Sequence, residues 1–84
     1  MMSESEVFFV YAIKSLNRNY IYVGLTDNIE RRVNQHNSGR SKTTKPYLPF
    51  KLILTEQYPT RSAARVREKY LKSGIGKEYL KTLN

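Results

Sequence analysis

Five side chains in this sequence carry groups that could together bind and hydrolyse a phosphate ester. Hydrolysis of a phosphodiester needs an activated water, neutralisation of the charge on the transition state, and help for the leaving oxygen. A divalent metal can supply more than one of these. The candidate catalytic residues supply two phenols, a guanidinium, an imidazole and a carboxylate, and they are Tyr11, Tyr22, Arg32, His36 and Glu68.

Arg32 and His36 are four residues apart, and this spacing makes them neighbours on one face of a helix. The planar guanidinium of Arg32 can bind two phosphate oxygens and stays charged at any working pH. An arginine on a helix often packs its stem over a neighbour, here Val33, and points its charge outward instead. An inward histidine is often only a hydrogen-bonded core residue. Both alternatives stay open.

The phenols of Tyr11 and Tyr22 could activate or position the attacking water. A free phenol titrates near pH ~10, so one of them would need a nearby cation or hydrogen bond to lower its pKa before it acts as a general base. His36 could supply that hydrogen bond or shuttle the proton. Simple packing within a strand is the alternative for each tyrosine.

Glu68 shares one face of an expected helix with Ala64 and Leu71, so its carboxylate points inward. Burial of a carboxylate costs several kcal/mol unless it is paired or binds a cation. Mg²⁺ keeps most of its waters and needs only one or two carboxylates, so Glu68 could hold one Mg²⁺ or Mn²⁺. No second inward carboxylate is found for a two-metal site. The alternative is an ion pair with Lys72, worth about 0.3–0.5 kcal/mol.

Alternating and helical patterns of apolar residues predict three strands and at least two helices. In a hairpin, the numbers of two residues that face each other add up to a constant, the register sum. Eleven positions separate Tyr11 from Tyr22, so an odd register sum places both phenols on one face of the sheet. Thr26 or Asp27 is expected to cap the first helix, and Gly39 to end it. The expected elements are strands at 7–13, 20–25 and 50–58, helices from 27 to about 37 and from 60 or 62 to 74, and a final turn or helix at 79–83.

These elements predict an α+β fold, in which helices flank a small three-stranded antiparallel sheet. We expect one site on one sheet face, between the strands and both helices. Gly24 lies inside a strand, where it could give clearance to a phosphate or to the following helix, or mark a bulge. The chain of 84 residues is expected to form a single domain over 1–84, with 1–6 as a frayed tail.

The chain is basic, with a formal charge of +8 from 15 Lys and Arg against 7 Asp and Glu. This charge favours a polyanion such as nucleic acid. Arg40, Lys42 and Lys45 lie in a polar loop at 39–49 and could bind backbone phosphates, or only keep a connection solvated. The absence of cysteine excludes a disulfide framework and a thiolate metal site. No segment reads as a signal peptide or a membrane span, so the expected compartment is the cytoplasm.

At its candidate catalytic residues the sequence resembles the GIY-YIG nucleases, over residues 8–73. The first half of the motif is Phe9-Val10-Tyr11 and the second is Tyr22-Val23-Gly24, followed in the family's order by Arg32, His36 and Glu68. The chain is similar to small stand-alone members and to the N-terminal nuclease domain of the excision-repair members of this family. Small members also carry a Thr-x4-Pro segment, here Thr44 to Pro49, and a lysine four places after the glutamate, here Lys72.

The resemblance implies that Tyr11 is the leading general base and Tyr22 the phenol that positions the water. Two features depart from the family. The first half of the motif lacks its glycine and isoleucine, and the asparagine that larger members carry beyond the glutamate has no counterpart except the terminal Asn84. These departures put the backbone of the first strand and the support of the metal site in question.

The expected function is divalent-metal-dependent cleavage of DNA, directed by substrate structure or by a partner rather than by sequence. Gly24 and Lys72 are expected to contact nucleic acid together with the basic residues of the loop. A protein partner or a homodimer could supply specificity, since so small a domain touches few phosphates. Two alternatives are a nucleic-acid-binding module without useful turnover and a basic domain that binds an acidic protein.

Overall fold

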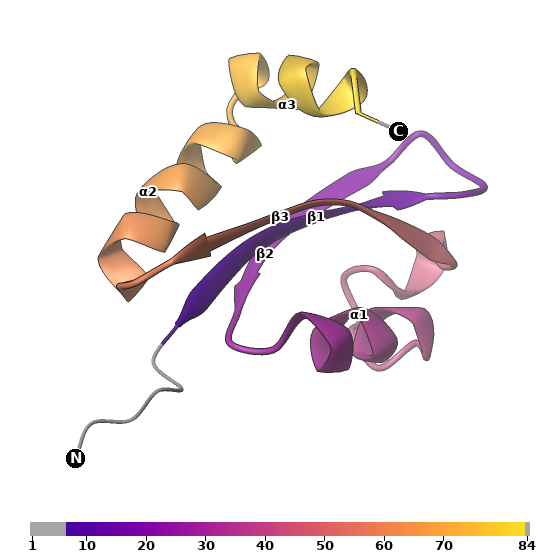
Figure 1. Ribbon diagram of the computed structural model, residues 1–84. Coiled ribbons are helices and arrows are strands. Elements are labelled where there is room, and N and C mark those ends of the chain that lie inside the picture. The colour runs from indigo at the N-terminus through magenta and orange to yellow at the C-terminus, as the bar shows by residue number, and fades with distance from the viewer. Residues whose placement is uncertain (1–6, 84) are drawn as a thin grey trace.

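The structure is a computed structural model that describes residues 7–83, so the expected tail at 1–6 lies outside the described residues. Three strands and three α-helices follow one another along the chain (Figure 1), with a short 3₁₀ turn before the third strand. The elements are β1 (Phe8–Ser15), β2 (Ile21–Thr26), α1 (Ile29–Asn37), the 3₁₀ turn η1 (Lys45–Tyr47), β3 (Phe50–Tyr58), α2 (Arg61–Lys72) and α3 (Gly74–Lys81).

The strands form one antiparallel sheet in the order β2-β1-β3, which confirms the expected α+β fold. β1 is central and pairs with both neighbours, and its register against β3 shifts between Ala12 and Ile13. Tyr11 lies opposite Gly24, and Ile13 opposite Tyr22. The register sum of β1 and β2 is therefore odd, and both tyrosines lie on the same sheet face, as their spacing predicted.

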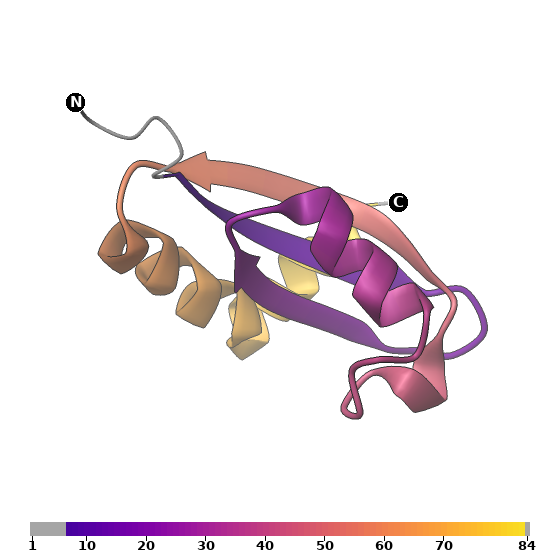
Figure 2. The ribbon, with the colours of Figure 1, turned by 90° about the horizontal axis from the view of Figure 1, so that it is seen from below.

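Apolar side chains cover both faces of the sheet. On one face Val10, Ala12 and Val23 pack against Ala64 and Leu71 of α2, together with Leu80 of α3. On the other face, three buried residues form a core with the side chains of α1 and η1, and they are Tyr11, Ile13 and Phe50. Figures 1 and 2 show α1 on one side of the sheet and α2 and α3 on the other.

The expectation that both helices flank a single sheet face is therefore wrong. Both faces of β1 are apolar, so each needs a cover, and the inward stripe of α2 covers the face opposite to the tyrosines. A carboxylate on α2 can approach the phenols only around the edge of the sheet. The sheet has two edge strands, β2 and β3, on either side of β1.

The ends of the helices differ in part from the expected ones. Asn28, rather than Thr26 or Asp27, caps α1, because its side chain accepts a hydrogen bond from the Arg31 backbone N–H at 3.0 Å. Gly39 follows α1 in the left-handed region, with φ of 81°, as expected for a helix stop. The last segment is a full helix that begins at Gly74, directly after α2 ends, with Ser73 as its cap.

Candidate active site at the edge of the sheet

Three aromatic rings from three elements form the centre of the site. The ring centroids of Tyr11 and Tyr22 lie 6.3 Å apart, and His36 of α1 lies 5.8 Å from the first and 5.0 Å from the second. Tyr11 and His36 are buried, whereas Tyr22 is partly exposed. Tyr22 is therefore the phenol of this cluster that solvent can reach.

A chain of two short hydrogen bonds fixes the buried part of the cluster. The Tyr11 hydroxyl and the Thr44 hydroxyl lie 2.8 Å from His36 Nε2 and Nδ1 respectively. Burial, together with the charge of Arg32, lowers the pKa of His36 to about 4, so the ring is neutral at pH 7. A neutral imidazole has one donor and one acceptor, so one hydroxyl donates to the ring and the other accepts from it.

The Tyr11 phenol is held in its protonated form. Burial, the neighbouring Tyr22 and, least of all, the Glu68 carboxylate raise its pKa to about 12, against the lowering effect of Arg32. A phenol with this pKa is a poor general base at neutral pH. Burial of Tyr11 and its bond to His36 suit a positioning role, and its assignment as the leading base stays a prediction.

Gly24 makes room for Tyr11 rather than for a phosphate. The ring of Tyr11 lies across Gly24, and a Cβ at residue 24 would lie 2.5 Å from the Tyr11 hydroxyl oxygen. Cross-strand pairing of these two residues brings them together, so only glycine leaves the space that the ring fills. The expected contact of Gly24 with nucleic acid is not supported by this geometry, because the buried ring covers it.

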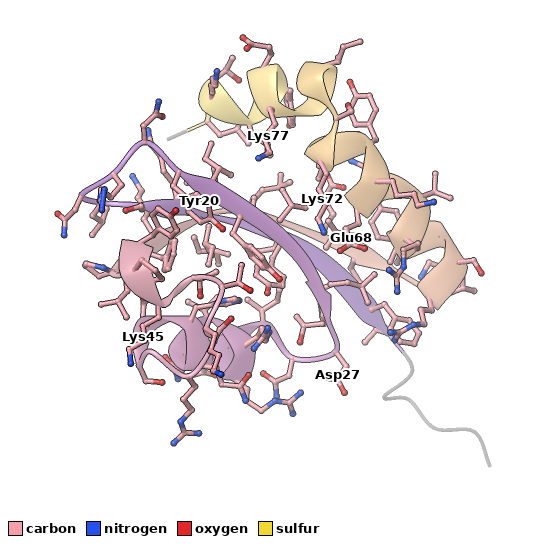
Figure 3. All side chains as sticks on the ribbon, turned by 180° about the vertical axis from the view of Figure 1, so that it is seen from behind. Tyr20, Asp27, Lys45, Glu68, Lys72 and Lys77 are labelled. Carbon is pink, nitrogen blue, oxygen red and sulfur yellow. The ribbon has the colours of Figure 1, made fainter. Side chains whose placement is uncertain are left out.

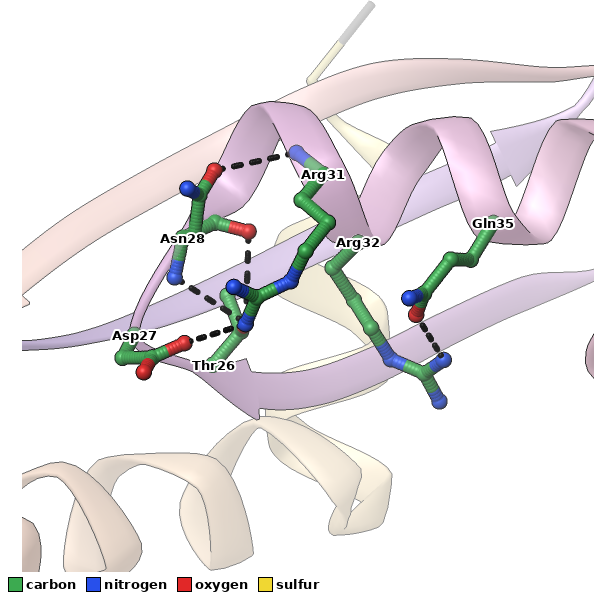
Figure 4. Close-up of polar contacts among 6 residues, drawn as sticks. All are labelled: Thr26, Asp27, Asn28, Arg31, Arg32 and Gln35. Carbon is green, nitrogen blue, oxygen red and sulfur yellow. Dashed lines mark hydrogen bonds and ion pairs between the residues drawn. The ribbon is translucent and has the colours of Figure 1, made fainter.

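Arg32 is partly exposed at the border between the ring cluster and solvent. Its Nη1 donates to Gln35 Oε1 at 2.9 Å (Figure 4), and within residues 7–83 it forms no ion pair with a carboxylate. It also lines a surface hollow of about 380 Å³ beside the ends of β1 and β2. The guanidinium therefore keeps free donors, as a phosphate-binding arginine requires.

Arg31 precedes Arg32 in α1 and lines the same hollow. It pairs with Asp27 at 2.6 Å, and both residues line the same hollow as Arg32 (Figure 4). Arg31 is exposed, and the sequence did not point to Gln35. The spacings were available as signals, since Asp27 and Arg31 are four residues apart and Arg32 and Gln35 three.

Glu68 comes from α2, on the opposite face of the sheet from α1. It is 8% exposed, and its Oε2 lies 3.2 Å from Lys72 Nζ, which is the alternative ion pair considered from the sequence. Its Oε1 is buried without a hydrogen-bond partner, although Arg65 Nε lies 3.7 Å away. Figure 3 shows Glu68 and Lys72 beside the sheet, and the Glu68 charge acts on Tyr11. Glu68 thus lies on α2, which covers the sheet face opposite to the phenols, and the hollow lined by Arg32 includes neither the phenols nor Glu68.

A buried carboxylate oxygen without a partner is the expected state of a metal ligand, so Glu68 fits a divalent cation. No group of three or more His, Asp or Glu within the described residues surrounds a common point, and Glu68 is the carboxylate among the candidate site residues. Mg²⁺ accepts such sites, because it completes its shell with water and substrate oxygens.

The three basic residues of the loop are exposed. Arg40 is exposed and lines a second hollow of about 330 Å³ together with Arg31 and Gln35. Lys42 and Lys45 are exposed, and Figure 3 shows Lys45 well away from Glu68. The loop also supplies Thr44, whose bond to His36 no sequence spacing indicated. The loop thus contributes exposed basic side chains at the surface and the buried Thr44 hydroxyl that bonds to His36.

The fold and the residues along the β2 edge define a small α+β domain of the nuclease type. The GIY-YIG catalytic domain family matches residues 7–83, and the chain belongs to this family, which interacts with nucleic acid and generally uses a divalent metal. Within residues 7–83, every helix is too short or too polar to cross a bilayer.

Several similar proteins carry the family name UPF0213. One from Natronomonas pharaonis is 38% identical over 66 residues, or 77% of this chain and 76% of its own. Another from Staphylococcus haemolyticus is 34% identical over 76 residues, or 89% of this chain and 92% of its own. The solution structure of a Bacillus halodurans UPF0213 protein is 30% identical, covers 90% of this chain and 83% of its own, and has a TM-score of 0.55.

Proposed function

We propose that this protein is a divalent-metal-dependent endonuclease that hydrolyses phosphodiester bonds in DNA. The observation that carries the proposal is Oε1 of Glu68, a buried carboxylate oxygen without a hydrogen bond, whose charge also acts on Tyr11 of the phenol cluster. A cation bound there would withdraw charge from the phosphate and lower the pKa of a bound water. Glu68 would hold it, with Lys72 free to turn to the substrate.

The remaining roles follow from accessibility and charge. Arg32 binds the non-bridging oxygens of the scissile phosphate, because its donors are free and its charge is permanent. Tyr22, the accessible phenol, orients and activates the attacking water. Tyr11, His36 and Thr44 hold the rings in place through their two hydrogen bonds, so His36 positions Tyr11 rather than carrying protons to solvent.

The protein selects its substrate by the structure of the DNA or through a partner protein, rather than by base sequence. A domain of 84 residues contacts few phosphates, so flaps, nicks or a partner protein would have to supply selectivity. DNA repair in the cytoplasm is the setting that this activity would suit.

A plasmid nicking assay tests the proposal. The full chain is incubated with supercoiled plasmid in Mg²⁺ or Mn²⁺, beside Glu68→Gln, which keeps the shape of the side chain but removes its charge. The parent should nick the plasmid, and Glu68→Gln should lose at least about 100-fold of the rate. A matched control is Glu78→Gln, on the exposed side of α3. Nicking by Glu68→Gln at the parental rate would contradict the metal assignment.

A second candidate is a nucleic-acid-binding module without turnover, and the Lys72–Glu68 ion pair favours it. In that case Lys72 would neutralise the carboxylate permanently and no cation would bind. Salt-sensitive gel shifts that are indifferent to Mg²⁺, with no nicked product from any plasmid or branched substrate, would support this candidate.

A further inference from the structure

Two adjoining hollows on the solvent side of α1 extend beyond the groups that the proposed chemistry needs. The first, of about 380 Å³, includes Arg31, Arg32 and Arg61. The second, of about 330 Å³, includes Arg31 and Arg40. The two hollows share Arg31 and Gln35, so they form one continuous surface along the helix.

The charge of this surface comes from separate elements. Arg61 opens α2, Arg31 and Arg32 lie on the same side of α1 (Figure 4), and Arg40 follows that helix. Of the described residues that line the two hollows, Asp27 is the one acid, against four arginines. Asp27 holds Arg31 through an exposed ion pair, which contributes little and leaves the remaining guanidinium donors available.

We propose that a polynucleotide backbone lies along this arginine surface, with phosphates at Arg61, Arg31 and Arg40 flanking the phosphate at Arg32. The inference rests on the proposed function and deepens it by naming the substrate class as a strand several nucleotides long. α1 has nine residues and is about 13 Å long, enough to contact several consecutive phosphates. Arginine forks bind phosphate oxygens in pairs, and such contacts fix a strand without reading its bases.

The polar residues between the arginines suit the same ligand. Gln35 lines both hollows, and Asn34 and Ser38 line the second one. Amide and hydroxyl groups of this kind donate to phosphate and sugar oxygens, and they are common in backbone contacts. An acidic protein would meet the same charges, so an acidic polypeptide serves as a competitor in the binding experiment.

Binding of labelled single-stranded DNA tests the proposal. Fluorescence anisotropy is measured in EDTA for a 12-nucleotide and a 3-nucleotide probe, in a salt series from 50 to 200 mM. The test variant is Arg31→Gln/Arg40→Gln/Arg61→Gln. The control variant is Arg18→Gln/Lys51→Gln/Lys69→Gln, which loses three charges outside the two hollows.

We expect the test variant to bind the 12-nucleotide probe about tenfold more weakly than the control does, with a log–log salt slope smaller by about 2. The affinities of the two variants for the 3-nucleotide probe should differ much less. Equal losses in both variants, no binding by the parent, or displacement of the probe by polyglutamate as readily as by unlabelled DNA would each overturn the proposal.

A plasmid nicking assay run in parallel distinguishes failure of the arginine-surface proposal from failure of the proposed nuclease function. If the parent nicks DNA in Mg²⁺ while the test and control variants bind alike, the arginine surface is wrong and the nuclease assignment stands. If no nicking occurs and the test variant alone loses binding, the nuclease assignment is wrong and the backbone-binding surface stands.

Discussion

Replacement of Gly24 by alanine should destabilise the protein and disrupt the site together. The added Cβ would lie 2.5, 2.7 and 2.8 Å from three atoms of the Tyr11 side chain, where carbon contacts are normally about 3.5–4.0 Å. Tyr11 is 1% exposed, so its ring has no free space to enter. The ring must therefore move, and its bond to His36 must lengthen or break.

The size of the effect follows from three contributions. Overpacking of a core costs about 1–3 kcal/mol, and a buried polar group left without its hydrogen bond costs about 1–3 kcal/mol more. Alanine in place of glycine returns about 0.5–1 kcal/mol because it restricts the unfolded chain. We expect the free energy of unfolding to fall by about 1–5 kcal/mol, with nicking activity lost in the fraction that stays folded.

Urea unfolding followed by circular dichroism measures this change, with Gly74→Ala as the matched control. Gly74 opens α3, and nothing lies within 4 Å of a Cβ built on it, so alanine there should be neutral or stabilising. If Gly24→Ala unfolds within about 0.5 kcal/mol of the parent, or if both alanines have the same effect, the close packing of Tyr11 on Gly24 does not hold.

Three further predictions concern residues around the same site. The pKa of His36 is lowered from 6.5 to about 4. As the pH falls between these two values, the unfolded chain binds a proton that the folded chain does not. The free energy of unfolding should therefore fall by up to about 3 kcal/mol between those pH values. Chemical denaturation at several pH values measures it, and a His36→Asn variant with the same pH slope would refute it. Asn37→Ala should destabilise by about 1–3 kcal/mol, because the Asn37 side chain accepts from the Phe50 N–H at 2.6 Å and donates to its carbonyl at 3.3 Å; Asn34→Ala, on the exposed side of α1, is the control. Thr44→Val should leave His36 Nδ1 unpaired and lower nicking without changing the affinity for DNA, and an unchanged rate would remove Thr44 from the support of the site.

The hairpin and the sharing of one sheet face by the two tyrosines could be predicted from sequence because strand geometry is strict. Side chains alternate between the two faces of a sheet along each strand. In a hairpin with an odd register sum, the odd spacing of Tyr11 and Tyr22 therefore places both phenols on the same face. The cap of α1 could not be fixed, because Thr26, Asp27 and Asn28 are all good caps and only backbone geometry chooses among them.

The face covered by each helix could not be predicted, since β1 is apolar on both of its faces and accepts either helix equally well. The bond between Thr44 and His36 was also out of reach, because it depends on the path of an irregular loop. The reason for Gly24 was hidden in the same way. Its clearance belongs to a ring thirteen residues earlier in the chain, and only the register identifies that ring.

Arg32 and Glu68 come from helices on opposite faces of the sheet, so in the proposed site the thickness of the domain sets the distance between their charged groups. Two helices that share a face can slide together, whereas these two are held apart by the sheet and by the side chains on both of its sides. Trimming a large residue on the inward face of α2, such as Leu71, should let that helix settle toward the sheet and change the distance between Glu68 and Arg32. In the proposed site, the volume of this core would therefore also set the distance between the carboxylate and the guanidinium.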